Sequence, residues 1–368
     1  METQTAARYH RQVLLPEVGP AGQAALAEAS VLIVGVGGLG TPAATYLAAA
    51  GVGRIGLVDF DRVDETNLHR QILYATGDVG RDKLDVARDR LRALNPHVSI
   101  ETHPARLDAS NALDLVAAYD LVLDGTDTFA TRYLVNDASV IAGTTNVFAS
   151  ISRFDGQVSV FGAPGGPCYR CLFPAPPPAG LVPNCAEGGV IGVLPGLLGT
   201  IQATEALKMI LDIGDPLVGR LLMVDALGMA FRELRVDRDP SCPVCGDHPT
   251  LTSLAPAAPM ASVPETTVRD LKARIDADDR PFVLDVREPD EYEGANIGGA
   301  LIPLGELPER LDEIREHQDD DVVVHCRSGG RSAKAVEYLR EHGFTNAVNL
   351  KGGIHAWSDQ IDPSLPKV

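Results

Sequence analysis

The feature that constrains this chain most is a glycine-rich turn between two short apolar runs. Residues 31–34 are apolar, residues 35–40 read Gly-Val-Gly-Gly-Leu-Gly, residues 41–50 are rich in alanine, and residues 55–58 are apolar again. This order predicts a strand, a turn, a helix and a second strand. Glycines at such a turn let the backbone and the helix N-terminus approach a phosphate group. We therefore expect an α/β fold that begins with a Rossmann-like nucleotide-binding unit.

Apolar runs and helical segments continue to alternate after this unit. Further strands are predicted at residues 98–101, 121–123, 145–148 and 157–161, with a helix at residues 83–94. Alternation of this kind predicts a largely parallel sheet that is covered by helices. A long helix at residues 190–210 and a hairpin of residues 221–224 with 231–236 are expected to follow.

Two domains are expected, because 368 residues exceed the usual size of one domain. Residues 250–264 are rich in Ala, Pro and Ser, a composition typical of linkers. The predicted domains are therefore residues 1–249 and residues 265–368. The second is also expected to be α/β, with strands at residues 282–286 and 322–326 and helices at residues 268–275 and 332–342.

Charge and composition narrow the class of partner. The formal net charge of −18 repels phosphate backbones, so we expect no direct nucleic-acid partner. Residues 1–19 contain no apolar signal-peptide core, and no stretch of roughly 18 uninterrupted apolar residues is present. The expected location is the cytoplasm, with no membrane span.

The glycine turn alone does not say which nucleotide is bound. Gly35, Gly37 and Gly40 form G-x-G-x-x-G, and Asp59 ends the second predicted strand, where an acid can bind ribose hydroxyls. This pattern fits an NAD-dependent oxidoreductase as well as an ATP-using enzyme. The turn lacks the Lys and the Ser or Thr of a P-loop, which excludes that class of ATPase.

Charged and polar residues downstream favour ATP over NAD. Asn67, Arg70 and Gln71 form N-x-x-R-Q, Lys83 follows, and Asp127 is expected at the end of a strand. A triphosphate requires cations and a carboxylate that holds Mg²⁺, whereas a nicotinamide site requires an apolar cleft. ATP and Mg²⁺ are therefore the expected ligands of this site.

These residues, together with residues 8–12 (Arg-Tyr-His-Arg-Gln), resemble the MoeB/ThiF branch of the ubiquitin-activating superfamily over about residues 5–250. The resemblance implies that Asp127 holds Mg²⁺ and orients the reacting phosphate. It implies that ATP is bound by Gly38, Asp59, Asn67, Arg70 and Lys83.

The resemblance also bears on three other residues. Arg11 would reach the triphosphate of a neighbouring subunit, which implies a homodimer. Thr128 departs from the family, in which Asn is common at this position. Asp61 could either bind nucleotide or cap the following turn.

Four of the six cysteines form two C-x-x-C pairs, Cys168 with Cys171 and Cys242 with Cys245. Four thiolates satisfy the tetrahedral coordination of Zn²⁺ and leave no position for water. We therefore expect a closed structural zinc site, against the alternatives of a disulfide pair or free thiols. The metal would connect two segments that lie far apart in the sequence.

Cys185 follows residues 173–184, which contain five prolines and are expected to form an extended crossover loop. This part of the chain resembles the cysteine-bearing crossover loop of the same family. The resemblance implies that Cys185 receives the carboxyl group of a carrier protein as a thioester or acyl disulfide. The alternative is a loop thiol with no role in the reaction.

The sixth cysteine, Cys326, follows a predicted buried strand and precedes the loop Arg-Ser-Gly-Gly-Arg at residues 327–331. Backbone N–H groups of such a loop, a helix N-terminus and Arg327 or Arg331 would stabilise a thiolate or persulfide. With residues 284–288 and 352–357, this pattern resembles a rhodanese domain over residues 262–368. A cysteine phosphatase has a longer C-x5-R loop, and the C-x4-R spacing here suits a single sulfur atom.

Other residues of this domain have expected roles that are not catalytic. Asp285 and Arg287 are expected to support the loop, and His325 to pack in the strand. Residues 295–297 read Ala-Asn-Ile where rhodaneses often have Gly-His-Ile, a departure that leaves the loop unchanged.

Both halves together resemble fused adenylyltransferase and sulfurtransferase proteins. The resemblance implies ATP-dependent adenylation of the C-terminal Gly carboxylate of a ubiquitin-like sulfur-carrier protein ending in Gly-Gly, and then sulfur transfer from a persulfide on Cys326. The sulfur donor would be thiosulfate or a cysteine desulfurase. The alternatives are an NAD-dependent oxidoreductase fused to a rhodanese and a non-catalytic scaffold for a ubiquitin-like protein.

Overall fold

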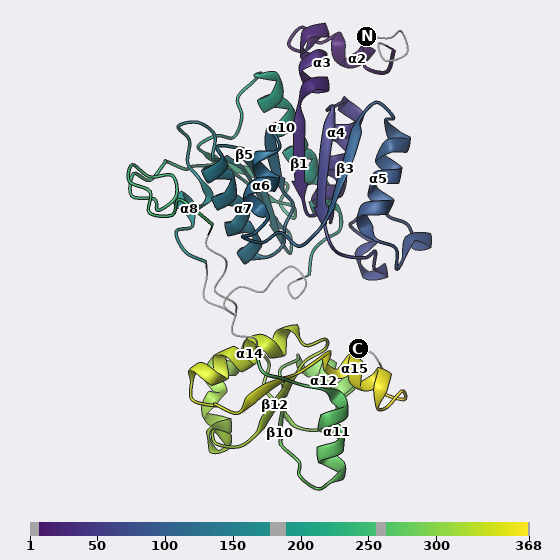
Figure 1. Cartoon of the computed structure of the whole chain (residues 1–368), viewed down its shortest axis with the longest axis vertical. Coiled ribbons are helices and arrows are strands. Elements are labelled where there is room, and N and C mark those ends of the chain that lie inside the picture. The colour runs from purple at the N-terminus through teal and green to yellow at the C-terminus, as the bar shows by residue number, and fades with distance from the viewer. Residues whose placement is uncertain (1–6, 177–188, 255–262, 367–368) are drawn as a thin grey trace. The chain divides into compact units, whose positions relative to one another are not determined.

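The structure, a computed structural model, describes residues 7–176, 189–254 and 263–366. These residues divide into two compact units, one within residues 7–254 and one within residues 263–366, and Figure 1 shows both. Each unit has its own sheet and its own hydrophobic core. The predicted α/β fold class is confirmed.

The first unit contains an eight-stranded sheet with the order β3-β2-β1-β4-β5-β6-β7-β8. The pairs from β3 to β5 are parallel, and the pairs from β5 to β8 are antiparallel. The prediction of a parallel sheet is thus confirmed for the five strands from β3 to β5 in this order. The predicted hairpin is formed by β7 and β8. The strands are β1 (Ser30–Val34), β2 (Arg54–Asp59), β3 (Ser99–Pro104), β4 (Leu121–Asp124), β5 (Thr145–Ser152), β6 (Asp155–Phe161), β7 (Arg220–Asp225) and β8 (Ala230–Arg235).

Helices cover both faces of this sheet. The α-helices are α2 (His10–Val13), α3 (Gly19–Glu28), α4 (Gly40–Ala50), α5 (Lys83–Leu94), α6 (Ala112–Ala117), α7 (Phe129–Ala142), α8 (Tyr169–Leu172) and α10 (Val193–Leu211), and the 3₁₀ helices are η1 (Glu65–Asn67) and η2 (Thr76–Asp78). Successive residues of a strand point to opposite faces. Val31 and Ile33 of β1 therefore pack with α4, α5 and α10, whereas Leu32 and Val34 pack with α6 and α7.

The strand order creates a switch point between β1 and β4. The helix that follows β1, α4, packs on one face of the sheet, and the helix that follows β4, α7, packs on the other. The two connections therefore diverge at the carboxyl ends of the strands and leave a crevice between them. This crevice is where an α/β sheet of this type binds its ligand.

The prediction that Asp127 ends a strand is wrong. The strand β4 ends at Asp124, and residues 125–128 form a loop before α7. The chain turns here because the Oδ1 atom of Asp124 accepts hydrogen bonds from the backbone N of Thr126 at 2.9 Å and from its Oγ1 at 2.6 Å. Asp127 therefore lies in a loop that is fixed by hydrogen bonds to Asp124, the buried last residue of β4.

The second unit contains a five-stranded parallel sheet with the order β11-β10-β12-β13-β9. Its strands are β9 (Glu265–Thr266), β10 (Phe282–Asp285), β11 (Ala300–Leu301), β12 (Val322–His325) and β13 (Ala347–Leu350). Its helices are α11 (Val268–Asp276), α12 (Pro289–Gly294), α13 (Leu307–Arg310), η3 (Leu311–His317), α14 (Gly330–Glu341) and α15 (Gly353–Gln360). The two predicted strands are present as β10 and β12, and the two predicted helices as α11 and α14. The helix α14 begins at Gly330 rather than at the predicted Ser332.

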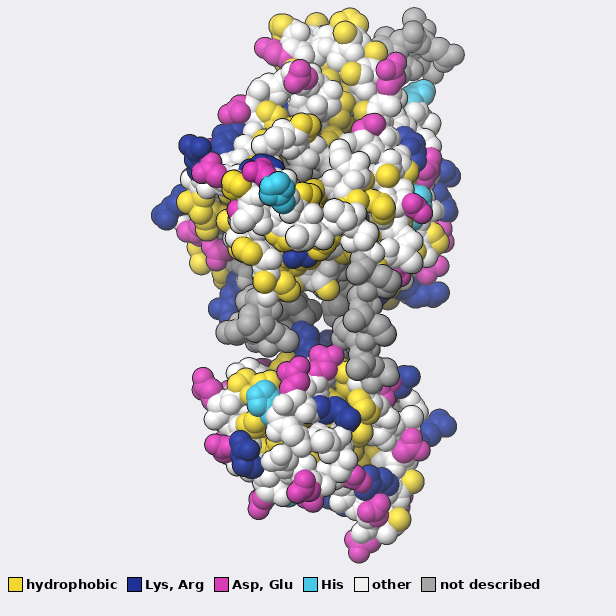
Figure 2. All heavy atoms as spheres, turned by 60° about the vertical axis from the view of Figure 1, so that its left-hand side comes forward, with side chains coloured by type: hydrophobic (Ala, Val, Ile, Leu, Met, Phe, Trp, Pro, Cys, Tyr) yellow, Lys and Arg dark blue, Asp and Glu magenta, His cyan; other side chains and the backbone are white. Residues whose placement is uncertain are grey.

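No helix of the described ranges is both long and apolar enough to cross a bilayer. On the face shown in Figure 2, acidic, basic and apolar side chains are interspersed over both units.

Candidate functional site

A cavity of about 240 Å³ lies at the carboxyl ends of β1, β2 and β4. Every residue that the sequence predicted to bind nucleotide lines this cavity, except Gly40. Those residues are Gly35, Gly37, Gly38, Asp59, Asp61, Asn67, Arg70, Gln71, Lys83 and Asp127. Gly35 and Asp127, which are 92 positions apart in the sequence, therefore meet in one crevice.

The glycine turn requires glycine at two positions for different reasons. Gly35 has φ +88°, and a Cβ atom there would lie 2.9 Å from the carbonyl oxygen of Gly125. A Cβ atom on Gly40 would lie 2.0 Å from the carbonyl oxygen of Gly35. Gly40 therefore allows α4 to start close against the turn, and it is not among the residues that line the cavity.

Asp59 connects the glycine turn to the end of β2. Its Oδ2 atom accepts a hydrogen bond from the backbone N of Val36 at 2.8 Å. Its Oδ1 atom accepts from the backbone N of Phe60 at 2.8 Å and of Asp61 at 2.9 Å. Each carboxylate oxygen has lone pairs left after these bonds. Asp59 is thus a rigid, buried acceptor at the position expected for ribose hydroxyls.

Asn67 organises the other two residues of its motif. Its Oδ1 atom accepts hydrogen bonds from Arg70 Nη2 at 3.0 Å and from Gln71 Nε2 at 2.9 Å. The Oε1 atom of Gln71 is buried without a hydrogen-bond partner in the structure. A buried polar atom of this kind usually has a partner, so its position in the cavity wall suits a polar ligand.

Lys83 and Asp61 lie together at the same cavity. Lys83 Nζ is 3.0 Å from Asp61 Oδ2, and the backbone N of Lys83 donates to the carbonyl oxygen of Asp61 at 3.1 Å. Asp61 therefore holds Lys83, a role beyond the two that the sequence left open.

Sequence reasoning missed Arg132, which lines the cavity from α7. Its Nη2 atom donates to the carbonyl oxygen of Thr126 at 3.4 Å, and its Nε atom is buried without a hydrogen-bond partner among the described residues. Burial raises the pKa of Asp124 nearby, and the charge of Arg132 opposes this shift. The available signal was a cation four residues after Thr128, the residue that caps α7. Thr128 itself caps α7, since its Oγ1 accepts from the backbone N of Thr131 at 3.2 Å.

Phe60 and Arg106 form a second feature of the cavity that the sequence did not reveal. The guanidinium of Arg106 lies 4.6 Å from the centre of the Phe60 ring, and both residues line the cavity. Phe60 is 57% exposed. An exposed aromatic ring with a stacked cation is a surface on which a nucleotide base can stack.

The four cysteines of the C-x-x-C pairs meet in the structure, as predicted. The Sγ atoms of Cys168 and Cys242 are 3.6 Å apart and those of Cys171 and Cys245 are 3.3 Å apart. All four sulfur atoms lie within 4.8 Å of one another. A tetrahedral site with Zn–S bonds of about 2.3 Å requires sulfur separations of roughly 3.8 Å. The arrangement therefore fits a four-thiolate zinc site.

The chemistry of the cysteine cluster also favours a cation. Burial raises the pKa of the Cys168 thiol, and the neighbouring thiols add to the shift. Zn²⁺ balances the charge of thiolates in such clusters. The helix α7 connects this cluster to the cavity, because Asp137 of α7 forms a bidentate ion pair with Arg170 at 2.7 Å and Asn136 accepts from the backbone N of Tyr169 at 2.7 Å.

Cys326 lies in the second unit, directly after β12. Its Sγ atom accepts a hydrogen bond from the backbone N of Gly329 at 3.2 Å and lies 3.4 Å from Ser332 Oγ. Gly329 has φ +100°, a conformation that L side chains rarely adopt. The α14 helix starts next to this loop, at Gly330. Of the backbone N–H groups that were predicted to surround the sulfur, that of Gly329 donates to it.

The residues behind this loop are buried, as the sequence suggested. Asp285 and Arg287 form a fully buried ion pair, with Oδ2 and Nη2 2.7 Å apart. Arg287 also donates to the carbonyl oxygen of Ala295 at 2.6 Å, in the segment that departs from the rhodanese pattern. His325 packs in β12, and burial lowers its pKa to about 4.

Arg331 has a partner that the sequence did not predict. Its guanidinium forms a bidentate ion pair with Glu291, at 2.6 Å and 2.7 Å. Burial would raise the pKa of Glu291, but hydrogen bonds from Arg331 and from the backbone lower it overall. The charge of Arg331 at the Cys326 loop is therefore compensated.

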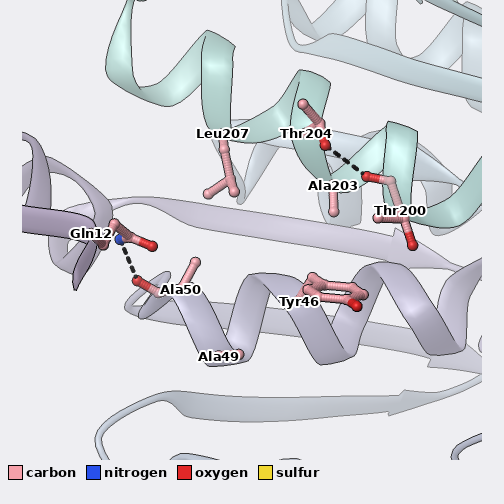
Figure 3. A pocket seen from close by; sticks show the side chains of 8 residues that line it. All are labelled: Gln12, Tyr46, Ala49, Ala50, Thr200, Ala203, Thr204 and Leu207. Atoms are coloured by element: carbon pink, nitrogen blue, oxygen red, sulfur yellow. Dashed lines mark hydrogen bonds between the residues drawn. The ribbon is translucent and has the colours of Figure 1, made fainter. Parts of the chain in front are cut away.

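One predicted residue, Arg11, lies outside these sites. Arg11, on α2, is not among the residues that line the nucleotide cavity, and it is exposed. Next to it, Gln12 lines a second cavity of about 260 Å³ between α4 and α10, where it donates to the carbonyl oxygen of Ala50 at 3.1 Å (Figure 3). Cys185, the predicted acyl acceptor, lies outside the described residues.

Comparison with protein families finds a match for each of the two units. The ThiF family model matches residues 9–244, and the model of the rhodanese-like domain matches residues 267–360. A crystal structure of E. coli MccB with MccA-N7isoASN has a TM-score of 0.59 and 24% sequence identity, covering 66% of this chain and 75% of that chain. At this identity the likeness concerns the fold alone.

Two relatives match nearly the whole chain, and a third matches two thirds of it. The probable adenylyltransferase/sulfurtransferase MoeZ of Mycobacterium tuberculosis is 45% identical over 375 residues, covering 99% of this chain and 96% of the relative. Adenylyltransferase and sulfurtransferase MOCS3 of Anopheles gambiae is 43% identical, covering 98% and 88%. The sulfur carrier protein adenylyltransferase of Thermus thermophilus is 59% identical over 252 residues, covering 67% and 93%. The chain therefore belongs to the ThiF family, with a rhodanese-like domain after the ThiF part.

Proposed function

We propose that this protein uses ATP to adenylate the C-terminal Gly carboxylate of a ubiquitin-like sulfur-carrier protein, and then transfers sulfur to it from a persulfide on Cys326. The observation that carries the proposal is the occurrence, in one chain, of two sites of complementary chemistry. One is a cavity lined by Arg70, Lys83 and Asp127, and the other is a loop that hydrogen-bonds the sulfur of Cys326. Relatives that match nearly the whole chain are named for these two activities.

Adenylation would take place in the nucleotide cavity. The carrier carboxylate attacks the α-phosphorus of ATP, a P–O bond forms, and the bond to the β-phosphate breaks with release of pyrophosphate. Asp59 would bind the ribose, and Arg70 and Lys83 would neutralise the departing charge. Asp127 would hold Mg²⁺, which would supply positive charge to the phosphate groups. The protein contributes mainly position and electrostatics.

Sulfur transfer would use Cys326 as the carrier of sulfur. The Cys326 thiolate attacks thiosulfate, forming a persulfide and releasing sulfite. The persulfide then attacks the acyl adenylate, which forms an acyl disulfide and releases AMP. Two electrons from a dithiol reductant cleave the S–S bond and give the carrier thiocarboxylate and the Cys326 thiolate. A cysteine desulfurase persulfide would load Cys326 by the same kind of exchange.

Cys185 would accept the acyl group in one branch of this scheme. In that branch the Cys185 thiolate attacks the acyl adenylate, forms a thioester with the carrier and releases AMP, and the Cys326 persulfide then attacks the thioester and displaces the Cys185 thiolate. We favour a contributing role over an obligatory one, because the Cys326 persulfide can attack the adenylate directly. Cys185→Ala should therefore lower the rate of thiocarboxylate formation without abolishing it, and should leave pyrophosphate exchange unchanged.

The proposal includes a structural zinc ion on Cys168, Cys171, Cys242 and Cys245, a cytoplasmic location and a homodimer. The position of Arg11 supports the homodimer, since it lies on α2 and is not part of the cavity wall of its own chain. The proposed domains are residues 1–249 and 265–368, with residues 250–264 as a linker. Limited proteolysis that leaves two stable fragments separated within residues 250–264 would support these boundaries.

Carrier-dependent exchange of pyrophosphate into ATP tests the proposal against its two alternatives. An adenylyltransferase exchanges pyrophosphate only when a carrier ending in Gly-Gly is present. A scaffold binds the carrier without exchange, and an oxidoreductase binds NAD and turns over no ATP. A carrier without its last Gly is the matched control. NAD binding in the cavity without any exchange would contradict the proposal.

A further inference from the structure

The hydroxyl of Ser332 lies between two acceptors in the second unit. Its Oγ atom is 2.7 Å from Asn349 Oδ1 and 3.4 Å from Cys326 Sγ. All three residues are at least 97% buried, with relative exposures of 0%, 3% and 1% for Ser332, Asn349 and Cys326. A hydroxyl has one proton to donate. It can therefore satisfy either the amide oxygen or the sulfur, but not both at once.

The orientation of the Asn349 amide decides which acceptor Ser332 meets. Asn349 lies in β13, which pairs in parallel with β9, with Glu265 as its register partner. Its Nδ2 atom donates to Glu265 Oε1 at 3.3 Å. Because a carboxylate accepts and cannot donate when ionised, this contact directs the NH₂ group to Glu265 and the carbonyl oxygen to Ser332.

We propose that Asn349 is a positioning residue that restrains the reactivity of Cys326 by holding the hydroxyl of Ser332. This inference rests on the proposed role of Cys326 as the sulfur-carrying thiol. While Asn349 takes the hydroxyl proton at 2.7 Å, Cys326 keeps one short hydrogen bond, from the backbone N of Gly329. When the hydroxyl turns to the sulfur, it adds a second donor that stabilises the thiolate or persulfide.

The proposal predicts opposite effects for two neighbouring substitutions. Ser332→Ala removes the second donor, so the thiolate is less stable and Cys326 reacts more slowly at a given pH. Asn349→Ala removes the competing acceptor, so Ser332 donates to the sulfur and Cys326 reacts faster. In the double variant the effect of Asn349→Ala disappears, because Asn349 acts only through Ser332. A purely structural contribution of Asn349 would lower reactivity in both backgrounds.

The test measures the rate of iodoacetamide alkylation of Cys326 in the reduced full-length protein, at one pH, by mass spectrometry of the peptide that contains it. We expect Ser332→Ala to slow alkylation by about threefold to tenfold and Asn349→Ala to accelerate it by a similar factor. Asn349→Leu keeps the branched shape of the side chain without its amide, so it should accelerate alkylation by a similar factor even if Asn349→Ala does not fold. Asn346→Ala is the matched control, since that exposed amide donates to Asp319 and not to the loop.

A second measurement separates this inference from the proposed function. Persulfide formation from thiosulfate is followed over a range of thiosulfate concentrations, and the Ser332 and Asn349 variants should change the maximal rate rather than the half-saturating concentration. If wild-type Cys326 forms no persulfide at all, the proposed function fails, whereas the alkylation rates still test the inference. Slower or unchanged alkylation in both folded Asn349 variants, or an equal effect of Asn349→Ala in the Ser332→Ala background, would overturn it.

Discussion

Lys83 and Asp61 form an ion pair at the nucleotide cavity, with Nζ and Oδ2 3.0 Å apart. The two side chains differ in environment, because that of Lys83 is 6% exposed and that of Asp61 is 53% exposed. A buried ammonium group is costly unless it is paired. The pair therefore stabilises the charge of Lys83 in the wall of the cavity, where we propose that it binds phosphate.

This relationship predicts unequal effects for the two substitutions. Lys83→Met should reduce carrier-dependent pyrophosphate exchange by about 100-fold, because it removes a cation from the site of charge transfer. Asp61→Asn should mainly raise the KM for ATP, since Lys83 keeps its charge but loses its partner. Asp82→Asn breaks a more exposed pair with Arg62 and serves as the matched control. Equal losses in both cavity variants would show that Asp61 has its own contact with nucleotide.

Asp127→Asn should abolish exchange while the protein remains folded. The substitution keeps the shape of the side chain and removes the charge that would hold Mg²⁺. We expect a loss of at least about 100-fold at any Mg²⁺ concentration, measured as pyrophosphate exchange alongside thermal unfolding. Asp108→Asn is the control, an exposed loop acid outside the cavity. Normal exchange in Asp127→Asn would remove this residue from the reaction.

Cys242→Ser should remove metal and stability together. Structural zinc contributes its binding free energy to folding, so we expect a loss of several kcal/mol in the stability of the first unit. Elemental analysis should find one zinc ion per wild-type chain and less in the variant. Because α7 joins the cysteine cluster to the cavity, the variant should also bind ATP more weakly. Wild-type protein without zinc, at an unchanged melting temperature, would contradict this prediction.

The buried His325 predicts a loss of stability of the second unit in acid. Burial lowers its pKa to about 4, from 6.5 for an ordinary histidine. The unfolded chain therefore binds a proton that the folded chain does not between about pH 6.5 and pH 4, and stability falls as the pH is lowered through this window. At pH 4 this difference in proton binding lowers the free energy of unfolding of the second unit by about 3 kcal/mol.

Trp357, the single tryptophan of the chain, lies in the second unit and reports its unfolding. Denaturant titrations followed by its fluorescence should show a shallower loss of stability in His325→Gln than in wild type between pH 6.5 and pH 4. His342→Gln, at an exposed histidine, should retain the wild-type slope. An identical slope in His325→Gln would exclude the histidine as the source.

The elements that could be predicted from the sequence are those whose residues signal their environment locally. The apolar runs of β1 and β2 are buried throughout or nearly so, and the two C-x-x-C pairs carry their own coordination chemistry. The positions of Asn67, Lys83 and Asp127 around one cavity were also expected, because a triphosphate requires cations and a carboxylate at one site.

Other features depend on contacts between distant segments and leave no local signal. The ion pair of Arg331 with Glu291 joins residues 40 positions apart, and the stacking of Arg106 on Phe60 joins the ends of β3 and β2. Gly40 was expected to bind nucleotide because it belongs to the motif, whereas its close approach to the carbonyl oxygen of Gly35 is visible only in the folded chain. Motif membership therefore predicts the site, and the contacts of each member come from the fold.

The measurement that tests the central claim most directly compares wild type with Cys326→Ala in the presence of a carrier ending in Gly-Gly, ATP, Mg²⁺, a dithiol and thiosulfate as the only sulfur source. Pyrophosphate exchange and the mass of the carrier are followed in parallel. Because adenylation involves no sulfur, Cys326→Ala should retain exchange at nearly the wild-type rate and produce no carrier thiocarboxylate. Full thiocarboxylate production by Cys326→Ala would contradict the proposed transfer of sulfur from Cys326.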